Sequence, residues 1–252
     1  MNKIIEKMKE IRPGQAGVIV FDTETKQVIN SYKPELIVPL ASAAKIGVGY
    51  CVAKWVEAGS VKWTELLEDI QFNPEEDSHL LYPHFQGRES LLLQDAVEVM
   101  IACHDSVVAD RIVDHCGGWK RIDQEVRARF TNLHISQDPQ DEERNVAELN
   151  DLLKLISVIY EGFEENPQLW TPILNGMVRQ QGDSQGIPAH HLTHMTGGLP
   201  SVIIDVGVIG SFHENPLLYV IGAKDLPSRF EYTEADEKVM EVLGLIYEQT
   251  AK

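Results

Sequence analysis

The sequence predicts an α+β protein in which an antiparallel sheet, flanked by terminal helices, is joined to an inserted all-helical lobe. Three observations support this prediction. Residues 3–11 place apolar side chains at helical spacing between charges, and two alternating segments follow at 16–22 and 27–32. The middle of the chain is helical in pattern, and extended segments around 195–209 come late, ahead of a C-terminal helix. Both ends of the chain therefore contribute to the sheet.

The segments at 16–22 and 27–32 are typical of a β-hairpin. Each is rich in residues that favour strands, and a short polar turn, Thr23-Glu24-Thr25-Lys26, separates them. The hairpin brings the chain to the run that starts at Pro39.

The run from Pro39 to Lys45 places a serine one helical turn before a lysine. The stretch 46–56 that follows is apolar with small residues, which predicts a buried helix. Residues i and i+3 share a helix face, so the hydroxyl of Ser42 and the amine of Lys45 can come within hydrogen-bond range. A partly desolvated lysine at a helix N-terminus has its charged form disfavoured, so it can take a proton from the serine. The same spacing also fits an N-capping serine followed by a solvated lysine.

The order of segments, with several local motifs, resembles the penicillin-recognising serine hydrolases and, among these, the class A β-lactamases. The resemblance extends over nearly the whole chain. Beyond the Ser42 run, it rests on Gly117-Gly118, Asp141-Glu142-Glu143-Arg144, Arg179-Gln180-Gln181, Ile187-Pro188, and the segment 194–209 that contains Thr196-Gly197-Gly198-Leu199-Pro200. The resemblance implies a β-lactamase/transpeptidase-like fold and acyl transfer through a serine nucleophile.

The resemblance places a second catalytic element at His104-Asp105-Ser106, where the family has Ser-Asp-Asn. In the family the serine relays a proton toward the leaving nitrogen, and the asparagine helps to hold the substrate. Here a histidine stands at the serine position and a serine at the asparagine position. An imidazole can relay a proton at neutral pH. The alternative is that His104 only starts a helix, with its ring nitrogens satisfied.

A third element is implied at Met195-Thr196-Gly197, where the family has Lys-Thr-Gly. The threonine and the glycine are retained, but the lysine that attracts a substrate carboxylate is replaced by methionine. Loss of such a charge-assisted contact weakens binding by ~1.5–3 kcal/mol. By the same resemblance, the backbone N–H groups of Ser42 and Gly198 form the oxyanion hole. The alternative for Met195 is a packing residue in a strand.

A fourth element is missing from the expected place. The family carries a glutamate on an omega-shaped loop that activates the water for deacylation, but the chain between 118 and 141 is too short for that loop. Glu148-Leu149-Asn150 echoes its pattern, but the glutamate position falls on Val146. The segment 146–156 has helical periodicity, so Glu148 is expected on an exposed helix face. Because loss of a general base slows its step ~10²–10⁴-fold, weak β-lactam turnover is expected.

Composition excludes several classes of function. The formal net charge of −17 argues against binding to nucleic acid or to anionic membrane surfaces. No stretch is long and apolar enough to span a bilayer. No phosphate loop, paired-histidine zinc helix or dinucleotide fingerprint is present, so neither a cofactor nor a metal is expected. The histidines at 190, 191 and 194 are interpreted as a surface cluster, because neighbours on a strand point to opposite faces.

Cysteine usage favours a reducing compartment. Cys51, Cys103 and Cys116 are odd in number and lack metal-type spacing, so reduced buried thiols are expected. Residues 1–11 lack the features of a signal peptide. We therefore expect an acidic cytoplasmic protein, the alternative being the mature form of a secreted one. Nothing in the sequence sets the oligomeric state.

The sequence predicts one composite domain with a cleft between two lobes. Residues 1–35 and 165–252 are assigned to the sheet lobe, and residues 36–164 to the helical lobe. Two functions remain open. The first is a serine hydrolase acting on a small ester or β-lactam-like substrate, with Ser42, Lys45, His104 and Ser106 in catalysis and residues 195–198 binding the substrate. The second is a binding or scaffold protein that keeps the fold without catalysis.

Overall fold

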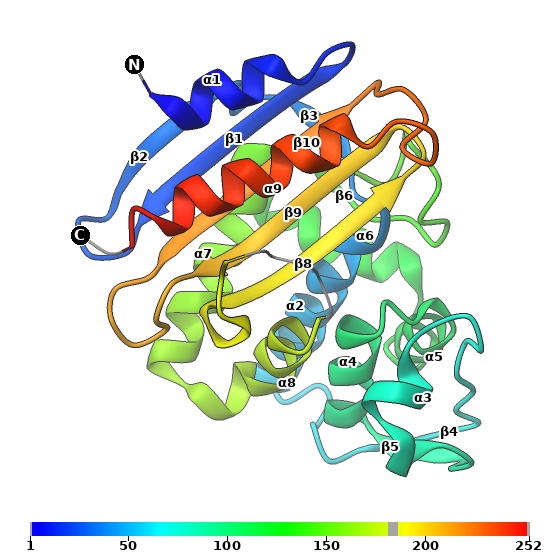
Figure 1. The fold of residues 1–252 in the computed structure, drawn as a ribbon. Coiled ribbons are helices and arrows are strands. Elements are labelled where there is room, and N and C mark those ends of the chain that lie inside the picture. The colour runs from blue at the N-terminus through cyan, green and yellow to red at the C-terminus, as the bar shows by residue number, and fades with distance from the viewer. Residues whose placement is uncertain (1, 181–185, 251–252) are drawn as a thin grey trace.

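A five-stranded antiparallel sheet is the centre of the described part of the chain, in the order β2-β1-β10-β9-β8 (Figure 1). The computed structural model describes residues 2–180 and 186–250, so Gln181 of the 179–181 motif lies outside it. The strands are β1 (Gln15–Asp22), β2 (Gln27–Tyr32), β8 (Leu192–Leu199), β9 (Val202–Ile209) and β10 (Leu217–Lys224). The α+β prediction is confirmed.

The predicted hairpin corresponds to β1 and β2. The two strands pair antiparallel, with a register shift between Val20 and Phe21. β1 then pairs along its full length with β10, so the N-terminal hairpin and the C-terminal strands form one sheet. This explains why segments so far apart in the sequence share one core.

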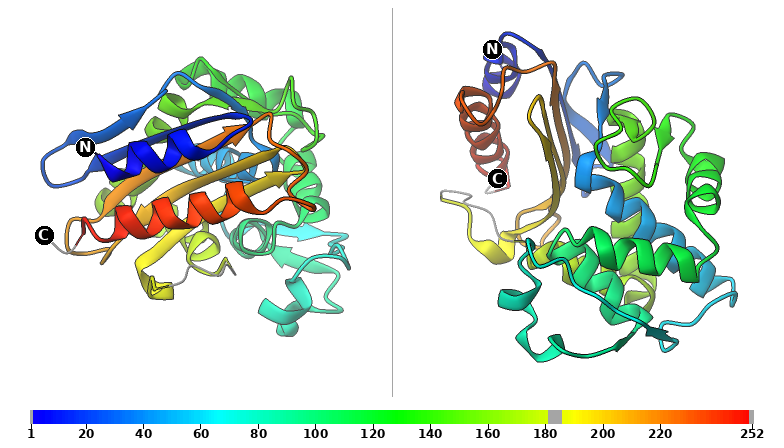
Figure 2. Two further views of the ribbon diagram at one scale, coloured as in Figure 1. Left: turned by 45° about the horizontal axis from the view of Figure 1, so that its top comes forward. Right: turned by 90° about the vertical axis from the view of Figure 1, so that its right-hand side faces the viewer.

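Helices cover both faces of the sheet (Figure 2). The terminal helices α1 (Lys3–Glu10) and α9 (Glu234–Tyr247) pack against each other on one face. In α9, buried Val239, Val242, Leu243 and Ile246 recur at helical spacing, while its first turn is acidic, as favoured at a helix N-terminus. α7 (Leu149–Glu165) lies against the opposite face, in contact with β1, β9 and β10.

Two apolar cores follow from this layering. Along β9, Ile204, Val206 and Val208 face the core shared with α7 and the other helices, whereas Ile203 and Ile209 face α1 and α9. Every residue of β9 is buried, so the central strand is apolar on both faces.

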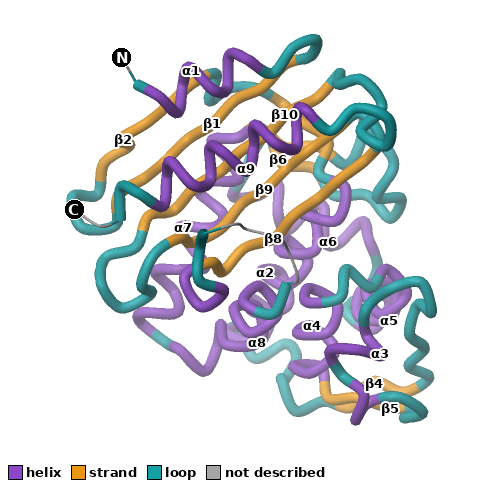
Figure 3. The backbone as a smooth tube through the Cα atoms, in the orientation of Figure 1, coloured by secondary structure: helices purple, strands orange, loops and turns teal. Residues whose placement is uncertain are grey.

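The remaining helices form a group beside and below the sheet (Figure 3). They are α2 (Ala44–Glu57), α3 (Ser78–Leu81), α4 (Leu93–Ala102), α5 (Ser106–His115), α6 (Trp119–Arg129) and α8 (Pro167–Val178), with short 3-10 turns η1 (Ala41–Ala43), η2 (Pro83–Phe85) and η3 (Ala189–His191). Two small sheets complete the fold: β3 (Ile37–Pro39) with β7 (Val146–Glu148) and β6 (Leu133–His134), and β4 (Leu66–Glu68) with β5 (Ser90–Leu92).

The structure corrects two local predictions. Ser42 lies in the 3-10 turn η1, just before α2, not in the first turn of the helix itself. Residues 146–148 form the strand β7 because they pair with β3, and the helix predicted from Val146 begins only at Leu149. Glu148 is therefore a strand residue that accepts hydrogen bonds from Asn132 and Asn150, not an exposed helix residue.

The two-lobe division remains a prediction. α8 follows residue 164, where the sequence placed the end of the helical lobe, yet it packs on α4, α2 and α7. Cys51, Cys103 and Cys116 are buried free thiols. Among the described residues, no helix has both the length and the apolar character that a membrane crossing requires.

Candidate active site

Ser42 and Lys45 form a contact at the start of α2. Nζ of Lys45 donates a hydrogen bond to Oγ of Ser42 over 3.3 Å. The lysine side chain is almost fully enclosed, with 5% of the residue exposed, whereas the serine is half-buried. The serine can therefore be reached from outside while its partner amine is kept from water.

A strained turn presents Ser42. Ala41 adopts φ 47°, a left-handed conformation that is uncommon for residues other than glycine. The turn is held from the loop before β7: Asn145 accepts a bond from the Leu40 N–H through its backbone carbonyl and donates from Nδ2 to the carbonyl of Ala41. One buried asparagine thus fixes the backbone on both sides of the turn.

The amine of Lys45 is tuned toward its neutral form. Burial lowers its pKa from 10.5 to about 8, and this effect exceeds the opposing pull of Glu76, Asp105 and Asp110. Near neutral pH an appreciable fraction of the amine is therefore able to accept a proton. This property suits the amine to act as a base toward the neighbouring serine.

Glu76 comes to the site from a loop that the sequence did not single out. The N–H of Asn73 donates to Oδ2 of Asp105, which ties the turn 73–76 to the residue that caps α5. Burial raises the pKa of the half-buried Glu76 carboxyl, and the positive charge of Lys45 opposes that rise. The two groups therefore influence each other's ionisation.

His104 is oriented by Gln180. Nε2 of His104 lies 3.1 Å from Oε1 of Gln180. The Gln180 amide donates from Nε2 to the carbonyl of Ile101, so its oxygen is the atom turned toward the ring. Nε2 of His104 is therefore the protonated nitrogen, which leaves Nδ1 as the acceptor.

The surroundings of His104 keep the ring neutral. Burial, assisted by the positive charge of Lys45, lowers its pKa to about 4. The residue also adopts a left-handed backbone conformation, φ 56°, between α4 and α5. At neutral pH the imidazole is therefore uncharged, and Nδ1 is the nitrogen that can accept a proton.

Strand β8 passes directly beside the serine turn. A Cβ on Gly197 would lie 2.3 Å from the carbonyl oxygen of Leu40, so only glycine permits this approach. The N–H of Thr196 donates to Oε1 of Gln180, which links the strand to His104. Gly198 is exposed, whereas the side chain of Met195 is fully buried and accepts a hydrogen bond from Nε2 of Gln180 through its sulfur.

Ser106 lines a small cavity beside Lys45. It is the first residue of α5, next to the capping Asp105. The cavity has a volume of about 20 Å³ and is bounded by Lys45, Asn145, apolar side chains of α2 and α5, and the loop 136–139. Within the described part of the chain, no carboxylate is among the residues that line it.

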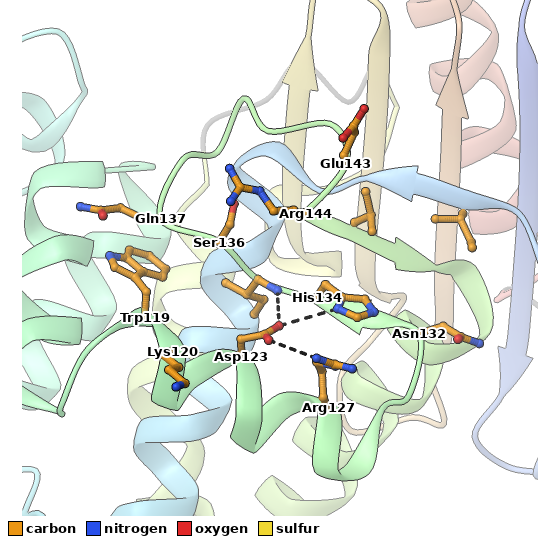
Figure 4. Close-up of a pocket in the computed structure, with 13 residues that line it drawn as sticks. Trp119, Lys120, Asp123, Arg127, Asn132, His134, Ser136, Gln137, Glu143 and Arg144 are labelled. Atoms are coloured by element: carbon orange, nitrogen blue, oxygen red, sulfur yellow. Dashed lines mark hydrogen bonds and ion pairs between the residues drawn. The ribbon is translucent and has the colours of Figure 1, made fainter.

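A larger hollow of about 630 Å³ lies on the outer side of that loop and shares Trp119, Ser136 and Gln137 with the small cavity. Figure 4 shows its polar centre, where Asp123 is paired with His134 and Arg127. Neither Ser42 nor Lys45 lines it. The serine and the lysine therefore lie outside this hollow.

The predicted surface cluster of three histidines is only partly present. The rings of His190 and His191 pack against each other near the surface, with their centroids 4.4 Å apart. His194 is instead buried, and its Nδ1 lies 3.0 Å from Oδ1 of Asp205, which also accepts a bond from Tyr219. Its place on β8 turns the ring toward the terminal helices, where an acidic partner satisfies it. Among the described residues, no group of three potential ligands is arranged to hold a metal.

The predicted site residues therefore lie on adjoining elements. Ser42, Lys45 and Ser106 surround the start of α2, and His104 and Thr196 are joined through Gln180. The sequence prediction did not assign a role to Gln180, Asn145 or Glu76. Only Gln180 had a signal, because it lies in the Arg179-Gln180-Gln181 motif.

The comparison with protein families gives one match. The model of a family described as the Beta-lactamase enzyme family matches residues 1–249. No sequence among curated proteins matches this chain.

Solved structures show the same fold. A mutant of PBP-A, solved as its acyl-enzyme complex with penicillin-G, has a TM-score of 0.81 and 20% identity, over 98% of this chain and 94% of that one. A beta-lactamase from Chitinophaga pinensis DSM 2588 has a TM-score of 0.82 and 15% identity, over 98% of this chain and 97% of that one. An ancestral (GNCA) class A beta-lactamase has a TM-score of 0.79 and 18% identity, over 98% of each chain.

Proposed function

Since the chain belongs to the beta-lactamase enzyme family, we propose that it is a serine hydrolase that transfers acyl groups from small esters, lactams or amides to water. Ser42 is the nucleophile and Lys45 is its base. The observation that carries the proposal is the buried Lys45 amine, 3.3 Å from Oγ of Ser42, with a pKa of about 8. A serine alone is a weak nucleophile, and an adjacent partly neutral amine removes its proton as it attacks.

The leaving group needs a proton of its own. His104 is one candidate donor, because its Nδ1 is not engaged by Gln180 and can relay a proton between Lys45 and the leaving atom. Ser106, which lines the small cavity beside Lys45, is the second.

Binding in the proposed reaction relies on β8. The backbone N–H groups of Ser42 and Gly198 stabilise the oxyanion, a role supported by the close approach of Gly197 to the serine turn. Thr196 and the exposed Gly198 line the substrate, while the buried Met195 offers no charge for a carboxylate.

β-Lactam turnover is proposed to be slow. The residues described around the small cavity beside Lys45 include no carboxylate that could activate water. Glu143 lines the outer hollow instead, and Glu142 accepts a bond from Ser201 at the surface. An acyl-enzyme formed from a lactam is therefore expected to persist, whereas small esters, which need no carboxylate anchor, turn over faster.

A binding protein without catalysis is the second candidate. The observation that favours it is Gln180, whose amide holds His104, Thr196 and Met195 together and so fills bonding positions that a substrate could use. In that case Ser42 and Lys45 remain in the fold but no longer take part in catalysis.

Steady-state assays of nitrocefin and p-nitrophenyl acetate on wild type and Ser42→Ala separate these functions. The hydrolase proposal expects Ser42-dependent ester turnover and a nitrocefin rate that falls after about one equivalent of product. Ester turnover that survives unchanged in Ser42→Ala supports the binding protein. Rapid, sustained nitrocefin hydrolysis contradicts the slow lactam step.

A further inference from the structure

The cavity beside Lys45 has the size of a single water molecule. Its volume is about 20 Å³, and a cavity needs about 10–15 Å³ to hold one water, together with two to four polar partners. Apolar walls come from Val48 on α2 and Ala109 on α5. Whether a water occupies such a cavity depends on the polar groups that face it.

Asn145 lines this cavity, and its side chain carries a buried acceptor. The residue is fully buried, and its Nδ2 donates to the carbonyl oxygens of Ala41 at 3.2 Å and Pro139 at 3.3 Å. These two bonds fix the orientation of the amide, because exchanging its atoms would set an oxygen against two carbonyl oxygens. Among the described residues, no group donates to the buried Oδ1.

Lys45 and Ser106 line the same space, as do Ser136 and Gln137 of the neighbouring loop. The amine of Lys45 carries protons beyond the one it donates to Ser42, and Ser106 stands at the start of α5. A water here would have an acceptor in Asn145, the amine in Lys45 and a hydroxyl in Ser106. Three partners match the usual number for a buried water.

We propose that this cavity binds one water between Oδ1 of Asn145 and Nζ of Lys45, and that this water hydrolyses the acyl group on Ser42. The hydrolytic role rests on the proposed function, but the binding of the water does not. Asn145 is a positioning residue in this account, and Lys45 serves as the base for both halves of the reaction.

The step balances with the groups at hand. The water oxygen attacks the carbonyl carbon of the acyl ester, and one of its protons passes to the neutral amine of Lys45. The tetrahedral intermediate then breaks its bond to Oγ of Ser42, which receives the proton back from Lys45. The products are the free acid and the original hydroxyl, so no further reactant is needed.

The position is consistent with attack on the ester. Nζ of Lys45 is 3.3 Å from Oγ of Ser42, so a water bonded to Nζ lies within two hydrogen-bond lengths of the serine oxygen. A route through Lys45 also accounts for hydrolysis at a small cavity where the described lining residues include no carboxylate.

A crystal structure of the full-length protein at high resolution tests the binding. We expect one water within about 3.2 Å of both Oδ1 of Asn145 and Nζ of Lys45. A dry cavity, or a water that contacts neither atom, overturns the proposal. This result does not depend on whether Ser42 reacts.

Enlarging a side chain of the cavity wall tests the role of the water in hydrolysis. Val48→Ile adds a methyl group to the cavity wall without touching the bonds of Asn145, and Val107→Ile is the matched control on the exposed face of α5. In single-turnover ester hydrolysis followed by mass, Val48→Ile should form acyl-enzyme at the wild-type rate but lose it at least about tenfold more slowly. Equal deacylation in a variant whose crystals lack the water overturns the hydrolytic role.

Asn145→Leu provides a second variant. It removes the acceptor together with the two Nδ2 bonds to Ala41 and Pro139, so acylation should slow as well. The positioning role predicts that deacylation slows more than acylation, whereas a merely structural asparagine would slow both steps by the same factor and lower the stability. If wild type never forms an acyl-enzyme, the proposed function and the hydrolytic role both fail, while the crystal still decides whether the water is bound.

Discussion

Nε2 of His104 and Oε1 of Gln180 lie 3.1 Å apart, so the tautomer of the histidine is set by a glutamine that follows the end of α8. The same glutamine accepts the N–H of Thr196 on β8. One amide therefore aligns the strand beside Ser42 with the residue that replaces a serine in the family pattern.

Replacing His104 tests its role in protonating the leaving group. An amine leaving group needs a proton, whereas p-nitrophenolate leaves without one, so His104→Ala should slow acylation by nitrocefin about 10²-fold and by p-nitrophenyl acetate only slightly. Ser106→Ala is the matched comparison, and the slowing of its nitrocefin reaction relative to its ester reaction should be smaller. The reverse ranking assigns the proton transfer to Ser106.

The pH dependence of acylation should follow the amine of Lys45. Its pKa is lowered to about 8, and only the neutral form is a base, so the rate should rise as pH increases through about 8 and level off above it. His104, with a pKa of about 4, stays neutral over this range and adds no further limb. Stopped-flow acylation by p-nitrophenyl acetate measures the profile, and a flat profile contradicts the base assignment.

Glu76→Gln should move that profile to lower pH. The carboxylate of Glu76 raises the pKa of Lys45, so removing its charge favours the neutral amine at a lower pH. Glu75→Gln, at the adjacent exposed position, serves as the control and should leave the midpoint unchanged. A shift of equal size in both variants would show only a general effect of net charge.

Lys45→Met should abolish Ser42 acylation and stabilise the fold. The folded state lowers the pKa of Lys45 from 10.5 to about 8, so at neutral pH burial of the charged amine costs stability. Removing the charge should raise the free energy of unfolding by about 2 kcal/mol at pH 7, since each pKa unit corresponds to about 1.4 kcal/mol and part is offset by the lost bond to Ser42.

The sign of the Lys45→Met effect fixes how it changes with pH. In the wild type, the free-energy cost of burying the charged Lys45 amine is fully present below about pH 8. It disappears as the pH rises toward 10.5, the pKa of lysine in the unfolded chain. The difference in the free energy of unfolding between the two proteins should therefore narrow over that interval. Urea unfolding at several pH values measures it, with Lys54→Met on the same helix as the control. A variant less stable than wild type at neutral pH would show that the buried amine is not strained.

The sequence predicted those parts of the fold that depend on neighbouring residues. The alternation at 16–22 and 27–32 became the β1–β2 hairpin, and the apolar stretch after Lys45 became α2. Periodicity failed at Val146 because pairing with β3 holds residues 146–148 extended.

The parts of the site that sequence could not supply depend on contacts across the fold. Gln180 reaches His104 from 76 positions away, and Asn145 reaches Ala41 from 104 positions away. Neither belongs to a short motif whose spacing implies the contact. Met195 shows the complementary case: its position in the motif was visible, but its burial against Gln180 depends on how α8 ends beside β8.

The most direct measurement of the central claim is intact-mass spectrometry of the wild type and Ser42→Ala after exposure to a fluorophosphonate probe and, separately, to benzylpenicillin. The buried Lys45 amine beside an accessible Ser42 predicts one covalent adduct per chain with the probe, a slowly cleared adduct with the penicillin, and neither in Ser42→Ala. Wild-type protein that stays unmodified at high probe concentration, or an adduct that persists in Ser42→Ala, would contradict the assignment of Ser42 as the nucleophile.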